Sequence, residues 1–313
     1  MQGLQISRSF YQECAAPLFR KELPDLMPFL AVGLVGEGSE CFGFDDEYSI
    51  DHDWGPGFCV WCSDRQLPEM RKRVEPVLRM LPENYMGHQT RMSLDHRNGR
   101  VGLFGIGEFH SRFINLDRPP ATIEEWFSIP EYFLATCTNG EIFSDPSGRY
   151  TAFRDVLLDY YPQDVRLKKM AARCAVMAQS GQYNFIRCMR RKDRGAAMLA
   201  VSRFVEATIS ILFLLSFEYM PFYKWAFRAC RDLLVAVPVI PSLEYLAGCS
   251  WMNDVGCVHE VELEVEAICS EIAGCLRAAG FSSNGSSWLM HHAEEVQKHI
   301  VHDGLRSLPV MSG

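Results

Sequence analysis

Two short groups of residues near the start of the chain have types and spacing that suit chemistry on phosphates. Gly38-Ser39 follows an apolar run, and a glycine–serine turn there would present backbone N–H groups and a hydroxyl that can hold a phosphate. Asp51 and Asp53 come about a dozen residues later. If they lie on a strand, their carboxylates point to the same face because they are two residues apart.

Two carboxylates on one face repel each other unless a cation lies between them. Oxygen ligands favour a hard ion, so we expect Mg²⁺, with Mn²⁺ as the alternative. Such an ion neutralises charge on a triphosphate and orients an attacking oxygen, which predicts transfer chemistry on a nucleoside triphosphate. The alternatives are a solvated strand edge for Asp51 and Asp53 and a plain β-turn for Gly38-Ser39.

The first part of the chain has the pattern of a mixed sheet with flanking helices. Short β-branched runs bounded by glycine and proline predict strands, and apolar residues at helical spacing predict helices. We expect strands over 29–35, 50–61 (interrupted at Gly55-Pro56-Gly57), 101–106 and 141–143, and helices over 4–22 and 67–81.

After residue 122 the pattern becomes almost entirely helical. We expect helices over 124–127, 130–138, 149–160, 164–191, 196–218, 222–235, 260–279 and 286–301. This change predicts an α+β protein with two domains: a mixed α/β domain over 1–145 and an all-α helical bundle over 146–313.

The stretch around the two groups resembles a known superfamily. A Gly-Ser followed about a dozen residues later by Asp-x-Asp is similar to the nucleotidyltransferase signature of aminoglycoside nucleotidyltransferases and DNA polymerase β. The longer string Gly-Glu-Gly-Ser-Glu-Cys-Phe-Gly-Phe-Asp-Asp-Glu, followed by Asp-His-Asp-Trp-Gly-Pro, resembles a bacterial branch described as domain of unknown function 4037. The resemblance extends to Tyr183-Asn184-Phe185, Arg187 and Tyr223-Lys224-Trp225.

The resemblance implies a polymerase β-like mixed sheet, followed by a helical bundle that closes one side of a nucleotide cleft. Carried over to this sequence, Gly38 and Ser39 contact the triphosphate, while Asp51 and Asp53 hold the metal and act in catalysis. Lys224 would reach the triphosphate from the helical half. The alternative for Lys224 is a surface lysine flanked by core aromatics.

Two further site residues are less clearly specified by the resemblance. The superfamily usually has a third carboxylate on a neighbouring strand, but 101–106 contains no acid. The nearest candidate is Glu108, which is either a ligand or base, or a cap of the following short helix. Arg187, between apolar neighbours, either turns inward to contact the nucleotide or belongs to a solvated face.

The whole-chain composition limits the partners. The chain has 313 residues and a formal charge of −8, which disfavours a protein that coats nucleic acid, so a small-molecule acceptor with a hydroxyl or amine is favoured. The apolar stretch Ile209–Phe217 is too short to cross a membrane. Twelve cysteines without an export signal favour reduced thiols in the cytoplasm. The rival functions are a nucleotide-binding protein that completes no transfer, and an interaction module whose helical half forms a homodimer.

Overall fold

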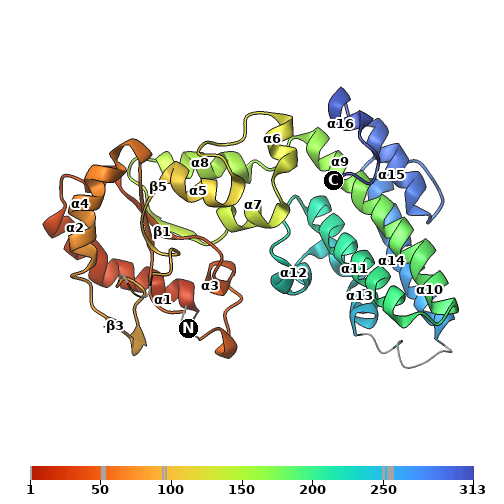
Figure 1. Cartoon of the computed structure of the whole chain (residues 1–313), viewed down its shortest axis with the longest axis horizontal. Coiled ribbons are helices and arrows are strands. Elements are labelled where there is room, and N and C mark those ends of the chain that lie inside the picture. The colour runs from red at the N-terminus through yellow and green to blue at the C-terminus, as the bar shows by residue number, and fades with distance from the viewer. Residues whose placement is uncertain (1, 51–53, 94, 96, 249–250, 252–256) are drawn as a thin grey trace. The chain divides into compact units, whose positions relative to one another are not determined.

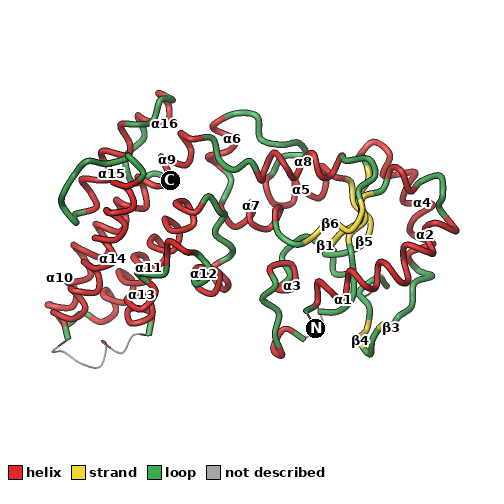
Figure 2. Tube along the Cα trace, turned by 180° about the vertical axis from the view of Figure 1, so that it is seen from behind, coloured by secondary structure: helices red, strands yellow, loops and turns green. Residues whose placement is uncertain are grey.

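The computed structural model describes residues 2–50, 54–93, 95, 97–248, 251 and 257–313 (Figures 1 and 2). The fold is α+β, and the chain divides into two compact units. Unit 1 comprises residues 1–121 and 129–159, and unit 2 comprises residues 122–128 and 160–313. Residues 146–159, which we assigned to the helical half from the sequence, pack within unit 1.

A four-stranded mixed sheet lies at the centre of unit 1. Its strands are β1 (Ala31–Leu34), β2 (Cys59–Cys62), β5 (Gly102–Gly105) and β6 (Glu141–Ser144), in the order β5-β2-β1-β6. β1 runs antiparallel to β2 and β6, whereas β2 and β5 are parallel. The predicted strands at 29–35, 101–106 and 141–143 are therefore confirmed, each within two residues of its expected ends.

Helices cover both faces of this sheet. Val32 and Val60 lie on one face, in a core shared with α1 (Gly3–Phe10), α2 (Ala16–Glu22) and α4 (Leu67–Leu78). Trp61 points to the other face, where it packs on Phe109 of α5 (Ile106–Ile114) and stacks on Tyr150 of α8 (Arg149–Leu158) at 3.9 Å. Figures 1 and 2 both show the two groups of helices on opposite sides of the strands.

The strand that we predicted from Ile50 onward is wrong in the part of the chain that the structure describes. Glu47–Ser49 forms a 3-10 helix, Ile50 and residues 54–58 are not in a strand, and β2 begins at Cys59. Gly55, at φ +147°, and Pro56 interrupt the extended chain. Cys59 and Cys62 lie three apart on β2, so their side chains point to opposite faces of the sheet.

Smaller elements complete unit 1. A hairpin that we had not predicted pairs β3 (Asn84–Tyr85) with β4 (His88–Gln89) through Met86 and Gly87, both at positive φ. The predicted helix over 4–22 is present as α1, a π-helical turn over Tyr11–Ala15, and α2. α7 (Glu131–Thr138) packs on α5 and α8.

Unit 2 is a bundle of helices. Its members are α6 (Ile123–Ser128), α9 (Gln163–Met177), α10 (Ile186–Arg190), α11 (Arg194–Ser216), α12 (Tyr223–Cys230), α13 (Ile240–Ala247), α14 (Val258–Ala278), α15 (Leu289–Lys298) and α16 (Asp303–Ser307). α9 packs against α11 and α15, and α13 packs against α14. A π-helical segment, Ala178–Phe185, joins α9 to α10. α13 and α16 were not predicted.

The apolar stretch predicted at Ile209–Phe217 belongs to the longer helix α11. In the described part of the chain, α11 alone is long and apolar enough to cross a membrane by length and composition. Its most apolar window is 61% buried inside the fold, which is how the core helix of a bundle behaves.

Candidate functional site

The Gly38-Ser39 pair follows the central strand β1. Gly36 has φ +146°, a conformation that L side chains rarely adopt, and the chain turns there to leave the sheet. Gly38 precedes a single helical turn, α3 (Ser39–Phe42), of which Ser39 is the first residue. Ser39 is half-buried, and Glu37 is exposed. The other predicted group, Asp51 and Asp53, lies outside the described residues.

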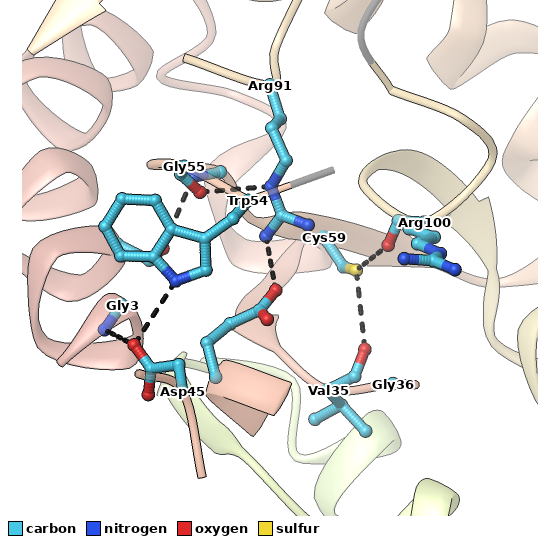
Figure 3. Close-up of polar contacts among 12 residues, drawn as sticks. Gly3, Val35, Gly36, Asp45, Trp54, Gly55, Cys59, Arg91 and Arg100 are labelled. Carbon is cyan, nitrogen blue, oxygen red and sulfur yellow. Dashed lines mark hydrogen bonds and ion pairs between the residues drawn. The ribbon is translucent and has the colours of Figure 1, made fainter. Parts of the chain in front are cut away.

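A buried ion pair packs against this turn (Figure 3). Glu40 is 3% exposed, and its Oε1 accepts a hydrogen bond from Nη2 of Arg91 at 2.8 Å. A Cβ at position 38 would overlap the Glu40 carboxylate, so the glycine leaves the space that the carboxylate fills. Charged groups this deeply buried must be paired, so Arg91 fixes the position of Glu40.

Arg91 also fixes the segment that follows Asp53. Its Nε donates to the carbonyl of Gly55 at 3.0 Å (Figure 3). Its backbone N–H donates to the carbonyl of Pro56 at 2.8 Å. A single arginine therefore ties the Gly38-Ser39 turn to the chain that leads from Asp53 into β2. We did not identify Glu40 or Arg91 from the sequence, because no local motif links two residues so far apart.

A second tether holds Trp54, the residue directly after Asp53. Oδ2 of Asp45 accepts hydrogen bonds from Nε1 of Trp54 at 3.2 Å and from the backbone N–H of Gly3 at 2.7 Å (Figure 3). The indole also packs edge-on against His88. Asp45, the first residue of the acidic run Asp45-Asp46-Glu47, therefore joins this run to the start of α1 and to Trp54.

The bend after β1 is tied to a distant part of unit 1. The backbone N–H of Gly36 donates to Oδ1 of Asn139 at 3.1 Å, and Nδ2 of Asn139 donates back to the Gly36 carbonyl at 2.7 Å. Arg154 in turn donates to the carbonyl of Asn139 at 3.1 Å. The carbonyl of Cys41 accepts from the N–H of Gly140 at 2.8 Å. These bonds tie the bend to the segment between α7 and β6.

The cysteines beside the turn are not suited to nucleophilic chemistry. Burial raises the pKa of Cys59 to about 12, and Sγ of Cys59 donates to the carbonyl of Arg100 at 3.2 Å (Figure 3). Burial also raises the pKa of Cys41 well above its usual range. Thiols with raised pKa values hold few thiolates at neutral pH, so reactivity here does not come from a cysteine.

The carboxylate of Glu108 caps a helix. Its Oε2 accepts from the backbone N–H of Gly105 at 3.2 Å, at the junction of β5 and α5. Asp64 supports the same helix start, because its carboxylate accepts from the N–H groups of Gly107 at 2.8 Å and Glu108 at 2.7 Å. β5 itself, Gly102–Gly105, carries no acid.

Lys224 and Arg187, the two predicted cationic contacts, lie in unit 2. Both are exposed. Lys224, on α12, has its ammonium 5.0 Å from the centre of the Trp225 ring. Arg187, on α10, lies over the ring of Tyr183 at 4.6 Å and donates to the Tyr183 hydroxyl, so of the two alternatives it belongs to a solvated face. Within unit 1 the structure thus brings together the turn, Glu40, Arg91 and the segment at Trp54. Lys224 and Arg187 belong to unit 2, so neither unit alone contains all the predicted site residues.

No group of three or more His, Cys, Asp or Glu side chains within the described ranges is arranged to hold a metal ion. Two acids near the turn have other partners: Glu40 pairs with Arg91, and Asp45 binds Gly3 and Trp54. Glu108 caps α5 after the end of β5, at the opposite end of the sheet from the turn, because β1 is antiparallel to β2 and β5 is parallel to β2. The two carboxylates that we predicted to hold a hard cation, Asp51 and Asp53, lie outside the described residues. Carboxylate oxygens in a pair suit Mg²⁺, which commonly takes one or two carboxylates and completes its coordination with water and phosphate.

Residues 126–226 match the model of a family described as a domain of unknown function, DUF4037. The match supports the part of the resemblance that involves Tyr183-Asn184-Phe185, Arg187 and Tyr223-Lys224-Trp225, all of which lie within it. The matched range starts after the Gly38-Ser39 turn and extends over parts of both units. No curated protein matches the chain.

Proposed function

We propose that this protein is a metal-dependent nucleotidyltransferase that moves a nucleoside monophosphate from a Mg²⁺-bound nucleoside triphosphate to a small acceptor. The acceptor's hydroxyl or amine forms a bond to the α-phosphorus, and the bond from that phosphorus to the bridging oxygen breaks. Pyrophosphate leaves with the electron pair, and the acceptor's proton passes to solvent. Such chemistry depends mainly on positioning and on neutralising charge.

The observation that carries this proposal is the place of Gly38-Ser39 in the fold. The pair sits on an open turn directly after the central strand β1, and the sequence places Asp51 and Asp53 about a dozen residues further along. Arg91 bonds both to Glu40 below the turn and to the two residues, Gly55 and Pro56, that follow the Asp pair closely. These bonds support the proposal, because they tie the turn to the segment that begins two residues after Asp53 in the sequence.

The roles follow from these positions. Gly38 and Ser39 would bind the phosphates through backbone N–H groups and the Ser39 hydroxyl. Asp51 and Asp53 would hold Mg²⁺, which supplies charge neutralisation on the triphosphate when bound. Lys224 would contact the departing pyrophosphate, and Arg187 the nucleotide. The net charge of −8 favours a small acceptor over a long nucleic acid.

Replacing the Asp pair tests the proposal. Asp51→Asn and Asp53→Asn should abolish Mg²⁺-dependent pyrophosphate release from a mixture of the four nucleoside triphosphates and a panel of hydroxyl and amine acceptors. Asp46→Asn is the matched control, because Asp46 lies shortly before Asp51 in the sequence and its Oδ1 caps the 3-10 helix Glu47–Ser49. Equal pyrophosphate release by all three variants and the wild type would rule the assignment out.

A second candidate is a nucleotide-binding protein of the same fold that completes no transfer. It is favoured by the absence of an acid on β5 and by the capping bond of Glu108. Calorimetry with Mg²⁺ and a non-hydrolysable triphosphate separates the two. Binding that Asp51→Asn weakens, with no pyrophosphate release from any acceptor, would establish this second function in place of the first.

A further inference from the structure

Unit 2 contains a pocket that the proposed transfer chemistry does not use. It has a volume of about 500 Å³ and is walled by α11, α12, the end of α13 and Met220. Val201, Val205 and Ile209 recur every four residues along α11, so they line the pocket from one helix face. The volume falls in the range of about 300–1,000 Å³ typical of small-molecule sites.

The lining is apolar with a small polar group at one side. Apart from Ser202, Glu206 and Tyr223, every residue that lines the pocket is apolar. Met198 and Met220 contribute flexible thioether side chains, which adapt to ligands of different shape. Tyr223 and Phe227 add aromatic rings on the α12 side. Such a surface would bind a hydrocarbon chain or ring by excluding water from it.

Among the described residues that line the pocket, Glu206 alone is charged. Its side chain is exposed, one turn along α11 from Ser202, so the carboxylate lies where the pocket meets solvent. Within the described residues, the Glu206 carboxylate makes no ion pair or hydrogen bond. An unpaired carboxylate beside aromatic rings attracts a cation, through charge and through the ring faces.

We propose that this pocket binds an amphipathic amine, with the apolar part between α11 and α12 and the ammonium group at Glu206. The cationic head keeps part of its hydration at the exposed rim, while the apolar part fills the dry interior. An anionic amphiphile of the same size would place its charge against the Glu206 carboxylate, which disfavours it. This inference does not rest on the proposed function, because no residue that lines the pocket is among those assigned to the nucleotide, although Lys224 lies on the same helix, α12.

Three probes of equal length test the head-group assignment on the full chain at pH 7: n-octylamine, octan-1-ol and octanoate. We expect n-octylamine to bind roughly threefold to tenfold more tightly than octan-1-ol, and octanoate to bind most weakly, by calorimetry and ligand-observed NMR. Glu206→Gln should reduce the affinity for the amine to that for the alcohol. Glu294→Gln, an exposed glutamate on α15, should leave the difference unchanged.

Two filling variants, Val205→Trp and Ser202→Trp, test the place of binding. Val205 is half-buried in the lining, whereas Ser202 is exposed at the rim. Because an exposed position tolerates a larger side chain, at least Ser202→Trp should fold as the wild type does, which circular dichroism measures. Both variants should abolish binding of amine and alcohol. Equal affinity of the wild type for amine and alcohol, or full binding by a folded Ser202→Trp variant, would overturn the proposal. So would a wild-type dimer that Ser202→Trp converts to a monomer, because a second copy would then occupy the pocket.

Discussion

Arg91 and Glu40 form an ion pair at 2.8 Å, with side chains only 5% and 4% exposed, directly beneath Gly38. The same arginine bonds the carbonyl of Gly55. One buried cation therefore bonds both to the residue beside the Gly38-Ser39 turn and to the segment that follows Asp53 in the sequence. Because Arg91 is covered from solvent, we expect it to act by positioning these two segments.

Removing one partner of this pair should be strongly destabilising. Arg91→Met or Glu40→Leu leaves a buried charge without a counter-charge, and we expect a loss of about 3–5 kcal/mol in the free energy of unfolding. The double variant should lose clearly less than the sum of the two. Urea denaturation measures all three.

The exposed pair Arg73–Asp25 provides the control for this experiment, because its Nη1–Oδ2 distance of 2.6 Å is as short as that of the buried pair. Arg73→Met should have a much smaller effect, since solvent screens exposed pairs. Two results would contradict the positioning role. One is a double variant whose loss in the free energy of unfolding equals the sum for Arg91→Met and Glu40→Leu. The other is an equal loss for Arg73→Met and Arg91→Met.

Adding one methyl group at Gly38 should disturb the same pair. A Cβ there overlaps the Glu40 carboxylate, so Gly38→Ala must displace it from Arg91. We expect a loss of about 1–3 kcal/mol in stability, together with weaker binding of Mg²⁺-bound triphosphate in calorimetry. Gly285→Ala is the control, since a Cβ at Gly285 meets nothing within 4 Å. Unchanged stability of Gly38→Ala would show that the turn does not depend on Glu40.

Glu108 can be tested as a cap and as a base in one experiment. Glu108→Gln keeps an oxygen that can accept from Gly105, so stability should change little, whereas Glu108→Ala should lose about 1 kcal/mol. Under the capping role, pyrophosphate release by Glu108→Gln stays near the wild-type rate. A stable Glu108→Gln variant with release lowered a hundredfold or more would instead identify Glu108 as the base.

Lys168 on α9 makes the stability of unit 2 depend on pH. Its side chain is fully buried, and Nζ donates to Oε1 of Gln297 at 2.9 Å and to the carbonyl of Pro309 at 2.7 Å. Burial lowers the pKa of Lys168 to about 8, below its usual 10.5. Between these two pH values the unfolded chain binds more protons than the folded one, so this residue's contribution to stability rises with pH.

The stability difference between wild type and Lys168→Met should therefore be constant below pH 8 and should grow in favour of the wild type from pH 8 to 10.5. Denaturation across this range measures it, with Lys298→Met, an exposed lysine on α15, as the control. A difference that stays flat to pH 10.5 would show that Lys168 keeps its usual pKa.

Much of the fold followed from local patterns. Buried β-branched runs gave β1 and β5, and helical spacing gave the long helices of unit 2, because both signals are periodic and local. The π-helical segments Tyr11–Ala15 and Ala178–Phe185 lie within stretches that we predicted as α-helix. A local change of helical pitch leaves little trace in the sequence. The strand expected from Ile50 failed because Gly55 and Pro56 interrupt the extended chain more strongly than we allowed.

The candidate site was only partly accessible from the sequence. Gly38 and Ser39 were located because turn residues after an apolar run form a local signal. The pair Glu40–Arg91 joins residues 51 positions apart and obeys no spacing rule, so only the folded chain reveals it. The sequence left open whether Arg187 turns inward, since its neighbours Phe185 and Ile186 are apolar and buried, whereas Arg187 itself is exposed.

The division of the chain into units has a consequence for how the protein is made. α6 lies in sequence between two parts of unit 1, yet it packs on α9, and its Trp126 ring meets that of Tyr161. During synthesis, α6 emerges before β6 and α8, so unit 1 must gain its edge strand while α6 still awaits its partner. Neither unit can therefore be expressed intact as one uninterrupted fragment, and proteolytic trimming would damage both together.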